Sequence, residues 1–325
     1  MKNKTLYLLA FALIFASFSC KKDDLSDIDF RQEMRDFVKN ISHYAKTKNP
    51  NFIIIPQNGQ ELITKSGEAN GTLQTQYIAA IDATGRESMF YGYYKDDEKT
   101  PDADNQHLLD LCLLCEKNNV EVLATDYCST KSKMDDSYQK NQENGFISFA
   151  ADQRELNNIP NYPSKIYNEN DANINNVSQA KNFLYLINNT QYDSKQDFID
   201  AVAASNYDLL IIDLFYNETA FTKSEIEQLK IKNNNAKRLV ICYMSIGEAE
   251  DYRYYWKSEW TDDKPNWLDE ENPEWKGNYK VKYWDKEWQN IIYGEKDVYL
   301  DRILNTGFDG VYLDIIDGFE YYEEK

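Results

Sequence analysis

The sequence predicts an α/β protein, a (β/α)8 TIM barrel whose chain order is circularly permuted. Three observations support this fold class. Short apolar, β-branched runs recur along the chain, and helix-like segments separate most of them. The last of these runs has no helix-like segment after it, whereas a helix-like segment stands before the first. Runs that are apolar throughout are typical of parallel strands buried on both faces, and their alternation with helices is typical of α/β folds.

Eight runs are candidates for the barrel strands, because each ends in a polar or small-residue break. In chain order they are residues 52–56, 77–81, 120–125, 146–150, 183–187, 209–214, 239–246 and 310–316. Eight strands with intervening helices fit a closed barrel, whose usual size is about 250 residues before insertions. The alternative is an open doubly wound sheet. Such a sheet usually carries a Gly-x-Gly-x-x-Gly turn after its first strand, and the sequence contains no such turn.

Helix-like segments fill most of the gaps between the strands. They span residues 106–118, 194–205, 223–233 and 298–306. Residues 30–46 also place apolar side chains at helical spacing, from Phe30 and Met34 to Tyr44, ahead of the first strand. The strand at 310–316 needs a helix to cover it, so we expect the N-terminal helix to follow that strand in space. This arrangement is a circular permutation, which is tolerated where chain ends lie close together.

Two segments interrupt the alternation. Residues 152–179 are polar and rich in Asn and Pro, which predicts a linker. Residues 252–294 form an insertion that contains all six tryptophans, and it follows a strand end, so it belongs to the active face of a barrel. These rings either stack on sugars or form a satellite core that packs the insertion down. Trp284 is the preferred sugar contact.

The N-terminus predicts an exported lipoprotein. Lys2 and Lys4 precede an apolar run at residues 6–18, as in a signal peptide, and the run is shorter than the roughly 20 residues of a membrane-spanning helix. Residues 1–20 are the expected signal, with lipidation at Cys20. Residues 20–24 resemble the cysteine, lysine and acidic signature of surface-exposed bacterial lipoproteins. An uncleaved core helix is the alternative. We expect a tether at 21–27, a single barrel domain at 28–325 and attachment to the outer membrane, at the cell surface.

Composition narrows the partners and the chemistry. The formal net charge of -19 makes nucleic acid and anionic lipid poor partners. An acidic chain rich in Tyr and Trp suits a neutral or cationic polymer, although many acidic proteins are merely soluble. The Cys112 and Cys115 pair has no matching second pair, which argues against zinc, and with His43 and His107 alone a histidine-based triad has little to build on. We expect a monomer without metal or cofactor.

Polar side chains follow the predicted strands. Asp314 is the clearest catalytic candidate, because it interrupts a buried strand and an unpaired buried carboxylate is costly. The alternative for Asp314 is the cap of a following turn. Barrels place their functional groups at the carboxyl ends of strands. The other candidates found at such ends are Gln57, Asn58, Asp82, Glu87, Asp126, Asp213, Glu248, Glu250, Asp251 and Asp317.

Three motifs make the sequence recognisable. Residues 243–253 (YMSIGEAEDYR), residues 274–285 (which begin EWKGNY) and residues 307–314 (GFDGVYLD) resemble glycoside hydrolase family 114. The resemblance is to its bacterial and archaeal branch, related to endo-α-1,4-polygalactosaminidases. It runs from 183 to 322 in the family's usual order and continues at the start of the chain, in residues 55–59, 80–82 and 87–91. It thus supports the permutation, with 152–179 joining the ancestral ends.

The resemblance implies a catalytic pair, Asp314 and Glu87. As a hypothesis, Asp314 is the nucleophile or charge stabiliser and Glu87 the general acid/base with a raised pKa, and the opposite assignment stays open. The implied reaction is the cleavage of internal bonds in an amino-sugar polymer such as α-1,4-polygalactosamine. The other strand-end side chains would hold the substrate. Three tyrosines are expected to line the cleft with them: Tyr91, Tyr127 and Tyr243.

Two other functions remain open. One is a surface glycan-binding lipoprotein that has kept the barrel and lost turnover. The other is a divalent-metal hydrolase that uses Asp213, Asp314 and Asp317.

Overall fold

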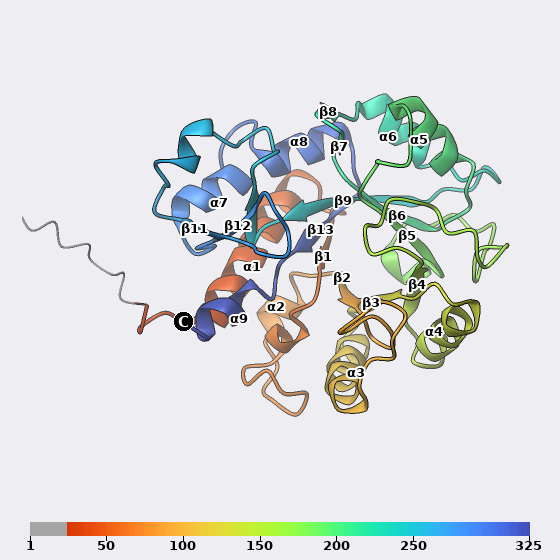
Figure 1. Ribbon diagram of the computed structural model, residues 1–325, viewed down its shortest axis with the longest axis horizontal. Helices are drawn as coiled ribbons and strands as arrows, with labels where there is room; N and C mark the ends of the chain where they lie inside the picture. The colour runs from red at the N-terminus through yellow and green to blue at the C-terminus, as the bar shows by residue number, and fades with distance from the viewer. Residues whose placement is uncertain (1–24) are drawn as a thin grey trace, which may run out of the picture.

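The structure is a computed structural model that describes residues 25–325 (Figure 1). The predicted signal peptide at 1–20, the lipidation site Cys20 and most of the predicted tether at 21–27 lie outside the described residues. Among residues 25–325, no helix is both long and apolar enough to cross a membrane.

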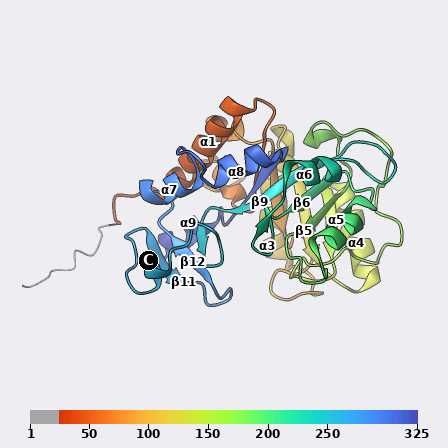
Figure 2. The ribbon, with the colours of Figure 1, turned by 90° about the horizontal axis from the view of Figure 1, so that it is seen from above.

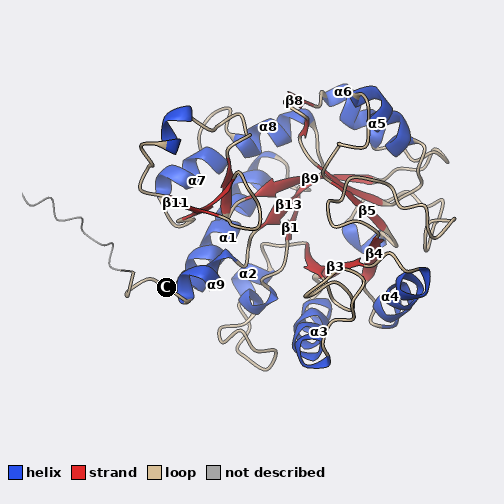
Figure 3. Cartoon of the chain, in the orientation of Figure 1, coloured by secondary structure: helices blue, strands red, loops and turns tan. Residues whose placement is uncertain are grey.

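Eight parallel strands of the described chain form two sheets, which confirms the α/β class. The five-stranded sheet has the order β1-β13-β9-β6-β5, and the three-stranded sheet the order β2-β3-β4. Figure 3 shows these strands in the middle of the molecule and the helices outside them. The strands are β1 (Ile53–Pro56), β2 (Ala83–Glu87), β3 (Glu121–Tyr127), β4 (Ile147–Ala151), β5 (Phe183–Leu186), β6 (Leu209–Ile212), β9 (Leu239–Ser245) and β13 (Gly310–Asp314).

The two sheets approach each other at both pairs of edges. Between β1 and β2, the amide of Asp82 donates to the carbonyl of Ile54 at 2.9 Å, and the amide of Asn58 donates to the carbonyl of Gly85 at 2.8 Å. Between β4 and β5, the rings of Phe149 and Phe183 lie 5.7 Å apart. These contacts are what a ring of eight strands would make. A fully closed barrel stays a prediction, because no complete ladder of strand pairing joins the two sheets within residues 25–325.

Helices cover the outside of the strands. Their ends follow local sequence signals: Asp29 accepts a hydrogen bond from the amide of Gln32 and caps α1, Thr222 and Glu225 form a capping box on α6, and Gly307 ends α8 at a φ of 92°. The helices around the strands are α1 (Phe30–Lys48), α2 (Thr75–Ile78), α3 (Asp102–Lys117), α4 (Lys131–Glu143), α5 (Lys195–Ala203), α6 (Lys223–Leu229), α8 (Tyr299–Thr306) and α9 (Gly318–Glu323), with the short 3-10 helices η1 (Gln60–Ile63) and η2 (Val177–Gln179).

The N-terminal helix α1 lies beside elements from the end of the chain. Arg31 pairs with Glu323 of α9 at 2.8 Å, and Lys48 pairs with Asp301 of α8 at 2.5 Å. Figure 2 shows α1 next to α7 (Lys286–Ile292) and α8. The expectation that α1 packs near the last strand therefore agrees with the structure. The expectation that no helix follows that strand is wrong, because α9 begins four residues after β13.

The second predicted strand is the main error in the assignment of secondary structure. Residues 77–81 are not a strand: Tyr77 and Ile78 belong to α2, and the strand is β2 at 83–87. The sequence of β2 contains little apolar surface because its interior position is taken by Gly85. A Cβ atom there would lie 1.9 Å from the hydroxyl of Tyr312. A tyrosine from β13 thus fills the space that an apolar side chain of β2 would otherwise occupy.

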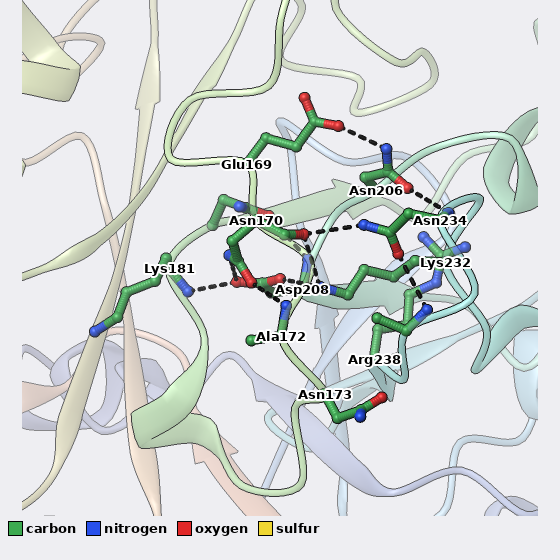
Figure 4. A network of polar contacts seen from close by, with 12 residues as sticks. Glu169, Asn170, Ala172, Asn173, Lys181, Asn206, Asp208, Lys232, Asn234 and Arg238 are labelled. Atoms are coloured by element: carbon green, nitrogen blue, oxygen red, sulfur yellow. Dashed lines mark hydrogen bonds and ion pairs between the residues drawn. The ribbon is translucent and has the colours of Figure 1, made fainter.

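A buried ion pair between Asp208 and Lys232 holds the segment at 152–179 against the amino ends of β5 and β6 (Figure 4). Asp208 and Lys232 have side chains with no exposed surface, and they lie 2.7 Å apart. The second oxygen of Asp208 accepts hydrogen bonds from the side chain of Asn170 and the amide of Lys181, each at 2.8 Å. The predicted linker is therefore held in place by the core rather than attached only at its ends.

The tryptophan-rich insertion forms a small layer of its own. Trp267 packs against Trp260 and Trp288 with ring centroids 5.0 Å apart in both cases, so most of the rings form a satellite core. Trp275 is different, since it is 50% exposed. The layer consists of the antiparallel strands β10 (Glu248–Glu250), β11 (Leu268–Glu271) and β12 (Asn278–Val281) with η3 (Ser258–Thr261) and α7. A separate hairpin is formed by β7 (Phe215–Tyr216) and β8 (Thr219–Ala220).

Candidate active site

A cavity of about 520 Å³ opens at the carboxyl ends of the strands. This is the face where barrels of this class carry their functional groups. Ten of the residues predicted from the sequence line it, and they come from both parallel sheets and from the insertion. They are Gln57, Asn58, Glu87, Tyr127, Asp213, Tyr243, Glu248, Glu250, Asp314 and Asp317.

Asp314 and Glu87 are the last residues of β13 and β2, with β1 between these strands. Each carboxyl accepts a hydrogen bond from a buried tyrosine. Tyr243 donates to Asp314 at 2.5 Å, and Tyr127 donates to Glu87. The side-chain amide of Asn58 donates a long hydrogen bond, of 3.4 Å, to the second oxygen of Glu87. The two carboxyls therefore face one cavity and are held by matching partners.

The electrostatic environment separates the acids from ordinary surface carboxyls. Burial, together with the negative charge of Glu87, raises the pKa of Asp314 to about 8, against the opposing effect of the hydrogen bond from Tyr243. Burial also raises the pKa of Asp317 to about 6, although the positive charge of Arg86 lowers it. At neutral pH Asp314 therefore holds a proton that it can donate.

The backbone is strained next to the two carboxyls. Ser88 follows Glu87 at a φ of 56°, Ile315 follows Asp314 at a φ of 59°, and Asn58 has a φ of 58°. These φ values lie in the left-handed region, which a β-branched residue such as Ile315 rarely adopts. Holding a non-glycine residue there costs roughly 1–3 kcal/mol of folding free energy. In this strained turn the backbone amide of Ile315 donates a hydrogen bond of 2.9 Å to the oxygen of Asp314 that Tyr243 does not bind. The strain thus serves to fix the carboxyl.

Arg253 organises the other wall of the cavity. Its buried guanidinium binds both oxygens of Asp213, at 2.9 and 2.8 Å, and both oxygens of Glu250, at 2.5 and 3.0 Å. Burial alone would lower the pKa of Arg253, but the two carboxylates raise it well above its usual value. Asp213 and Glu250 were predicted to hold substrate. In the structure they hold an arginine, and they shape the cavity through it.

Residues 164–325 match the family model of glycoside hydrolase family GH114. The chain belongs to this family. A relative with 45% identity over 185 residues is the uncharacterized protein MJ1477 of Methanocaldococcus jannaschii, and the match covers 55% of this chain and 50% of that protein. Uncharacterized proteins of Thermotoga maritima and Deinococcus radiodurans are 41% and 37% identical over 124 and 131 residues, which cover 38% and 40% of this chain and 37% and 40% of those proteins. The chain thus spans half the length of these curated relatives or less.

The GH114 match begins at residue 164, inside the segment 152–179, and includes Asp314 but not Glu87. GH114 proteins are (β/α)8 barrels, in line with the α/β architecture seen here. A start inside this segment is what a permuted order predicts, and the permutation itself stays a prediction.

Glu248 of the GH114 motif is buried at the edge of the cavity. One oxygen accepts a hydrogen bond from Asn272 at 2.8 Å, and the other has no partner among the described residues. Burial raises the pKa of Glu248. The predicted contact between Glu248 and substrate stays a prediction, with an unpaired oxygen that favours it.

Five predicted site residues lie outside the main cavity. Asp82 precedes β2 instead of following a strand, and it binds the amide of Ile54 and the amine of Lys46. Trp284 packs 5.1 Å from Phe30 and 4.7 Å from Tyr322 on the side of the insertion. The structure thus contradicts the predicted strand-end position of Asp82 and separates Trp284 from the cavity.

Asp126 and Tyr91 were predicted to line the cleft, but both side chains are buried beside the cavity and do not line it. The buried carboxylate of Asp126 accepts hydrogen bonds from the amides of Phe90 and Tyr91 and from the hydroxyl of Ser137, so it organises the loop after β2. The hydroxyl of Tyr91 donates to Asp136 at 2.7 Å. The fifth residue, Asp251, lies in a neighbouring hollow.

Several lining residues were missed by sequence reasoning. Trp275 and Arg253 stand inside the quoted GH114 motifs, so the signal was present and was not used. Arg154 comes from the segment 152–179, and its guanidinium lies 4.0 Å from the ring centroid of Tyr127. No sequence pattern around Arg154 predicts this contact. The other missed residues are Leu156, Tyr185, Ile187, Asn188, Tyr252, Lys276, Asn278 and Ile315.

Within residues 25–325, no group of three His, Cys, Asp or Glu side chains is arranged to hold a metal ion. Of the three aspartates in the metal hypothesis, Asp213 is already bound by Arg253. The site therefore gives no support to metal-assisted hydrolysis by Asp213, Asp314 and Asp317.

Proposed function

We propose that this GH114 protein is a glycoside hydrolase that cleaves glycan chains with Asp314 and Glu87. The observation that supports this most directly is the pairing of the two carboxyls in one cavity, with Asp314 protonated near neutral pH. Glycoside hydrolysis requires one carboxyl that donates a proton and a second one that is charged. Membership of GH114 supports the same reaction class.

The raised pKa favours Asp314 as the general acid, the reverse of the assignment given first from the sequence. Asp314 would donate its proton to the glycosidic oxygen while the bond to the anomeric carbon breaks. Glu87 would either attack that carbon or take a proton from the attacking water. In both routes one water molecule is consumed, its hydroxyl joins the anomeric carbon, and Asp314 regains a proton. Retention or inversion of the anomeric configuration distinguishes the two routes.

An amino-sugar polymer, such as α-1,4-polygalactosamine, is the proposed substrate. Six carboxyl side chains line the cavity, against the cationic side chains of Arg154, Arg253 and Lys276. Arg253 is already paired with two of these carboxylates. An acidic cavity in a chain of net charge -19 favours a cationic sugar over an anionic one.

The proposal also covers the closure of the barrel, the order of its strands in the chain and the attachment of the protein to a membrane. We propose a closed, circularly permuted barrel that is anchored by lipid on Cys20 to the outer membrane and acts as a monomer. The contacts at both sheet edges support the closed ring, and the start of the GH114 match at residue 164 supports the permutation.

A glycan panel with product analysis tests the function. The protein is incubated with α-1,4-polygalactosamine, its N-acetylated form, chitosan and a neutral glucan, and new reducing ends are counted. We expect release of internal fragments from polygalactosamine and little from the glucan. Binding without any release of reducing ends would instead identify a non-catalytic glycan-binding lipoprotein.

The pH profile gives a further prediction. For the wild type, kcat/KM is expected to fall as the pH rises through about 8, because Asp314 then loses the proton that it must donate. The hydrogen bond from Tyr243 lowers the pKa of Asp314, so Tyr243→Phe should move the falling limb to higher pH. Tyr216→Phe serves as the control, since its hydroxyl binds the carbonyl of Tyr192 instead. A limb that stays in place in Tyr243→Phe would exclude Asp314 as the acid.

A further inference from the structure

A second hollow of about 410 Å³ adjoins the main cavity. Tyr252 and Arg253 line both spaces, so the two are neighbours that share a wall. The remaining lining comes from two segments. The hairpin of β7 and β8 supplies Phe215 with its turn, Asn217 and Glu218, and the segment after β10 supplies Asp251 and Tyr254. Neither Asp314 nor Glu87 reaches this hollow.

Tyr252 links the two spaces. Its hydroxyl donates to Glu250 in the main cavity at 2.6 Å, and its side chain remains 59% exposed. Arg253 beneath it is bound by Asp213 and Glu250, so its charge is already balanced. The second hollow therefore presents aromatic rings and the carboxylates of Glu218 and Asp251, without an unpaired cation from Arg253.

Tyr254 is exposed and also held in position. The guanidinium of Arg302 lies 3.7 Å from its ring centroid, and the rings of Phe215 and Tyr299 lie 6.0 and 5.9 Å away. Its side chain is nevertheless 38% exposed. The ring of Tyr255, 5.6 Å away, is a fourth neighbour. A ring that is held by four neighbours and still open to solvent is pre-organised for stacking, because little side-chain entropy remains to be lost on binding.

Exposed aromatic rings gather at these two spaces. Within residues 25–325, the large exposed tyrosines and tryptophans are Tyr93, Tyr94, Tyr252, Tyr254 and Trp275, and the last three line one hollow or the other. Clustered exposed apolar surface marks a binding site more often than scattered residues do. The cluster continues from the main cavity into the second hollow across Tyr252.

We propose that the second hollow is a distal saccharide subsite, which binds a sugar unit of the same glycan some units away from the bond cleaved at Asp314. The sugar would stack on Tyr254 and Tyr252, and its hydroxyl or ammonium groups would donate hydrogen bonds to Asn217, Glu218 and Asp251. This proposal rests on the proposed function and extends it. It makes chain length a determinant of specificity, so that long chains are preferred over dimers.

The test compares α-1,4-linked galactosamine oligosaccharides from the dimer to the octamer. For Tyr254→Ala we expect KM for the octamer to rise about ten-fold, as for the loss of one stacking contact, with KM for the dimer and kcat at saturation unchanged. Tyr254→Phe keeps the ring and should behave as the wild type. The control Tyr94→Ala removes an exposed tyrosine that lines neither hollow, and it should leave both KM values unchanged.

A binding measurement separates this proposal from the proposed function. Calorimetric titration of the same oligosaccharides into Asp314→Asn, with and without Tyr254→Ala, reports affinity without turnover. If the wild type cleaves nothing but the octamer binds about ten-fold more weakly to the double variant, the subsite stands and the hydrolase proposal fails. An equal loss for dimer and octamer, no loss for either, or no binding at any length would overturn the subsite.

Discussion

Asp314→Asn is expected to lower kcat about a thousand-fold, with the fold intact. A positioned general acid contributes typically about a hundred- to ten-thousand-fold to a rate, and asparagine has the same shape without a transferable proton. Burial and the charge of Glu87 raise the pKa of Asp314 to about 8, so the group is already uncharged at neutral pH. The neutral amide therefore keeps the charge of the site, and its oxygen can still accept the hydrogen bond from Tyr243. Release of reducing ends from the best panel substrate measures the effect, and thermal unfolding checks the fold.

Asp317→Asn is the matched control for that substitution. Asp317 lines the same cavity, and burial raises its pKa as well, to about 6, yet it follows the strand end, and its hydrogen-bond partner is the side chain of Asn58. We expect a loss of less than about ten-fold in kcat. Glu87→Gln should resemble Asp314→Asn, because both carboxyls act in one step. Activity of Asp314→Asn within about ten-fold of the wild type would remove Asp314 from the mechanism.

The sequence predicted the parallel strands where their burial leaves a continuous apolar run. β9 and β13 lie within the predicted ranges, because both strands are covered on both faces by core. β2 was missed for a tertiary reason. Its interior space is filled by Tyr312 from another strand, so β2 carries Gly85 where a local pattern would require an apolar residue.

The position of Asp314 and Glu87 at one cavity was predictable, and much of its surroundings was not. Parallel strands of a barrel end at one face, so strand-end carboxyls such as Asp314 and Glu87 meet although they lie far apart in the chain. Whether a strand-end carboxylate faces the cavity is decided by other segments. Asp126 turns into the core because Ser137 and the amide of Phe90 bind it there.

The prediction of Trp284 as the sugar contact met the same limit, because distant segments decide which side chains reach the cavity. Trp284 and Trp275 belong to one aromatic-rich segment, and composition alone does not tell a buried ring from an exposed one. Trp284 packs on Phe30, which the fold brings from the other end of the chain, whereas Trp275 remains half exposed at the cavity. Arg253 was overlooked because its role depends on Asp213, which reaches it from a different strand end.

Lys232→Met is expected to lower the free energy of unfolding by about 3–5 kcal/mol without changing kcat. The substitution leaves the fully buried carboxylate of Asp208 without the amine that it pairs with, and removing one partner of a buried pair costs about this much. Kinetics should not respond, since Asp208 directly precedes β6, at the amino ends of the strands, and neither partner lines the cavity at their carboxyl ends. Denaturation in urea, followed by fluorescence, gives the change in stability.

Two further variants show whether the cost comes from the charge left without its partner. Lys95→Met breaks an exposed pair with Glu98, in which Lys95 is 73% exposed, and such pairs contribute at most about 1 kcal/mol. Combining Lys232→Met with Asp208→Leu removes both charges and should recover part of the loss. Recovery stays incomplete because Asn170 and the amide of Lys181 lose their acceptor. If Lys232→Met were no more destabilising than Lys95→Met, the pair would not hold the segment 152–179 to the core.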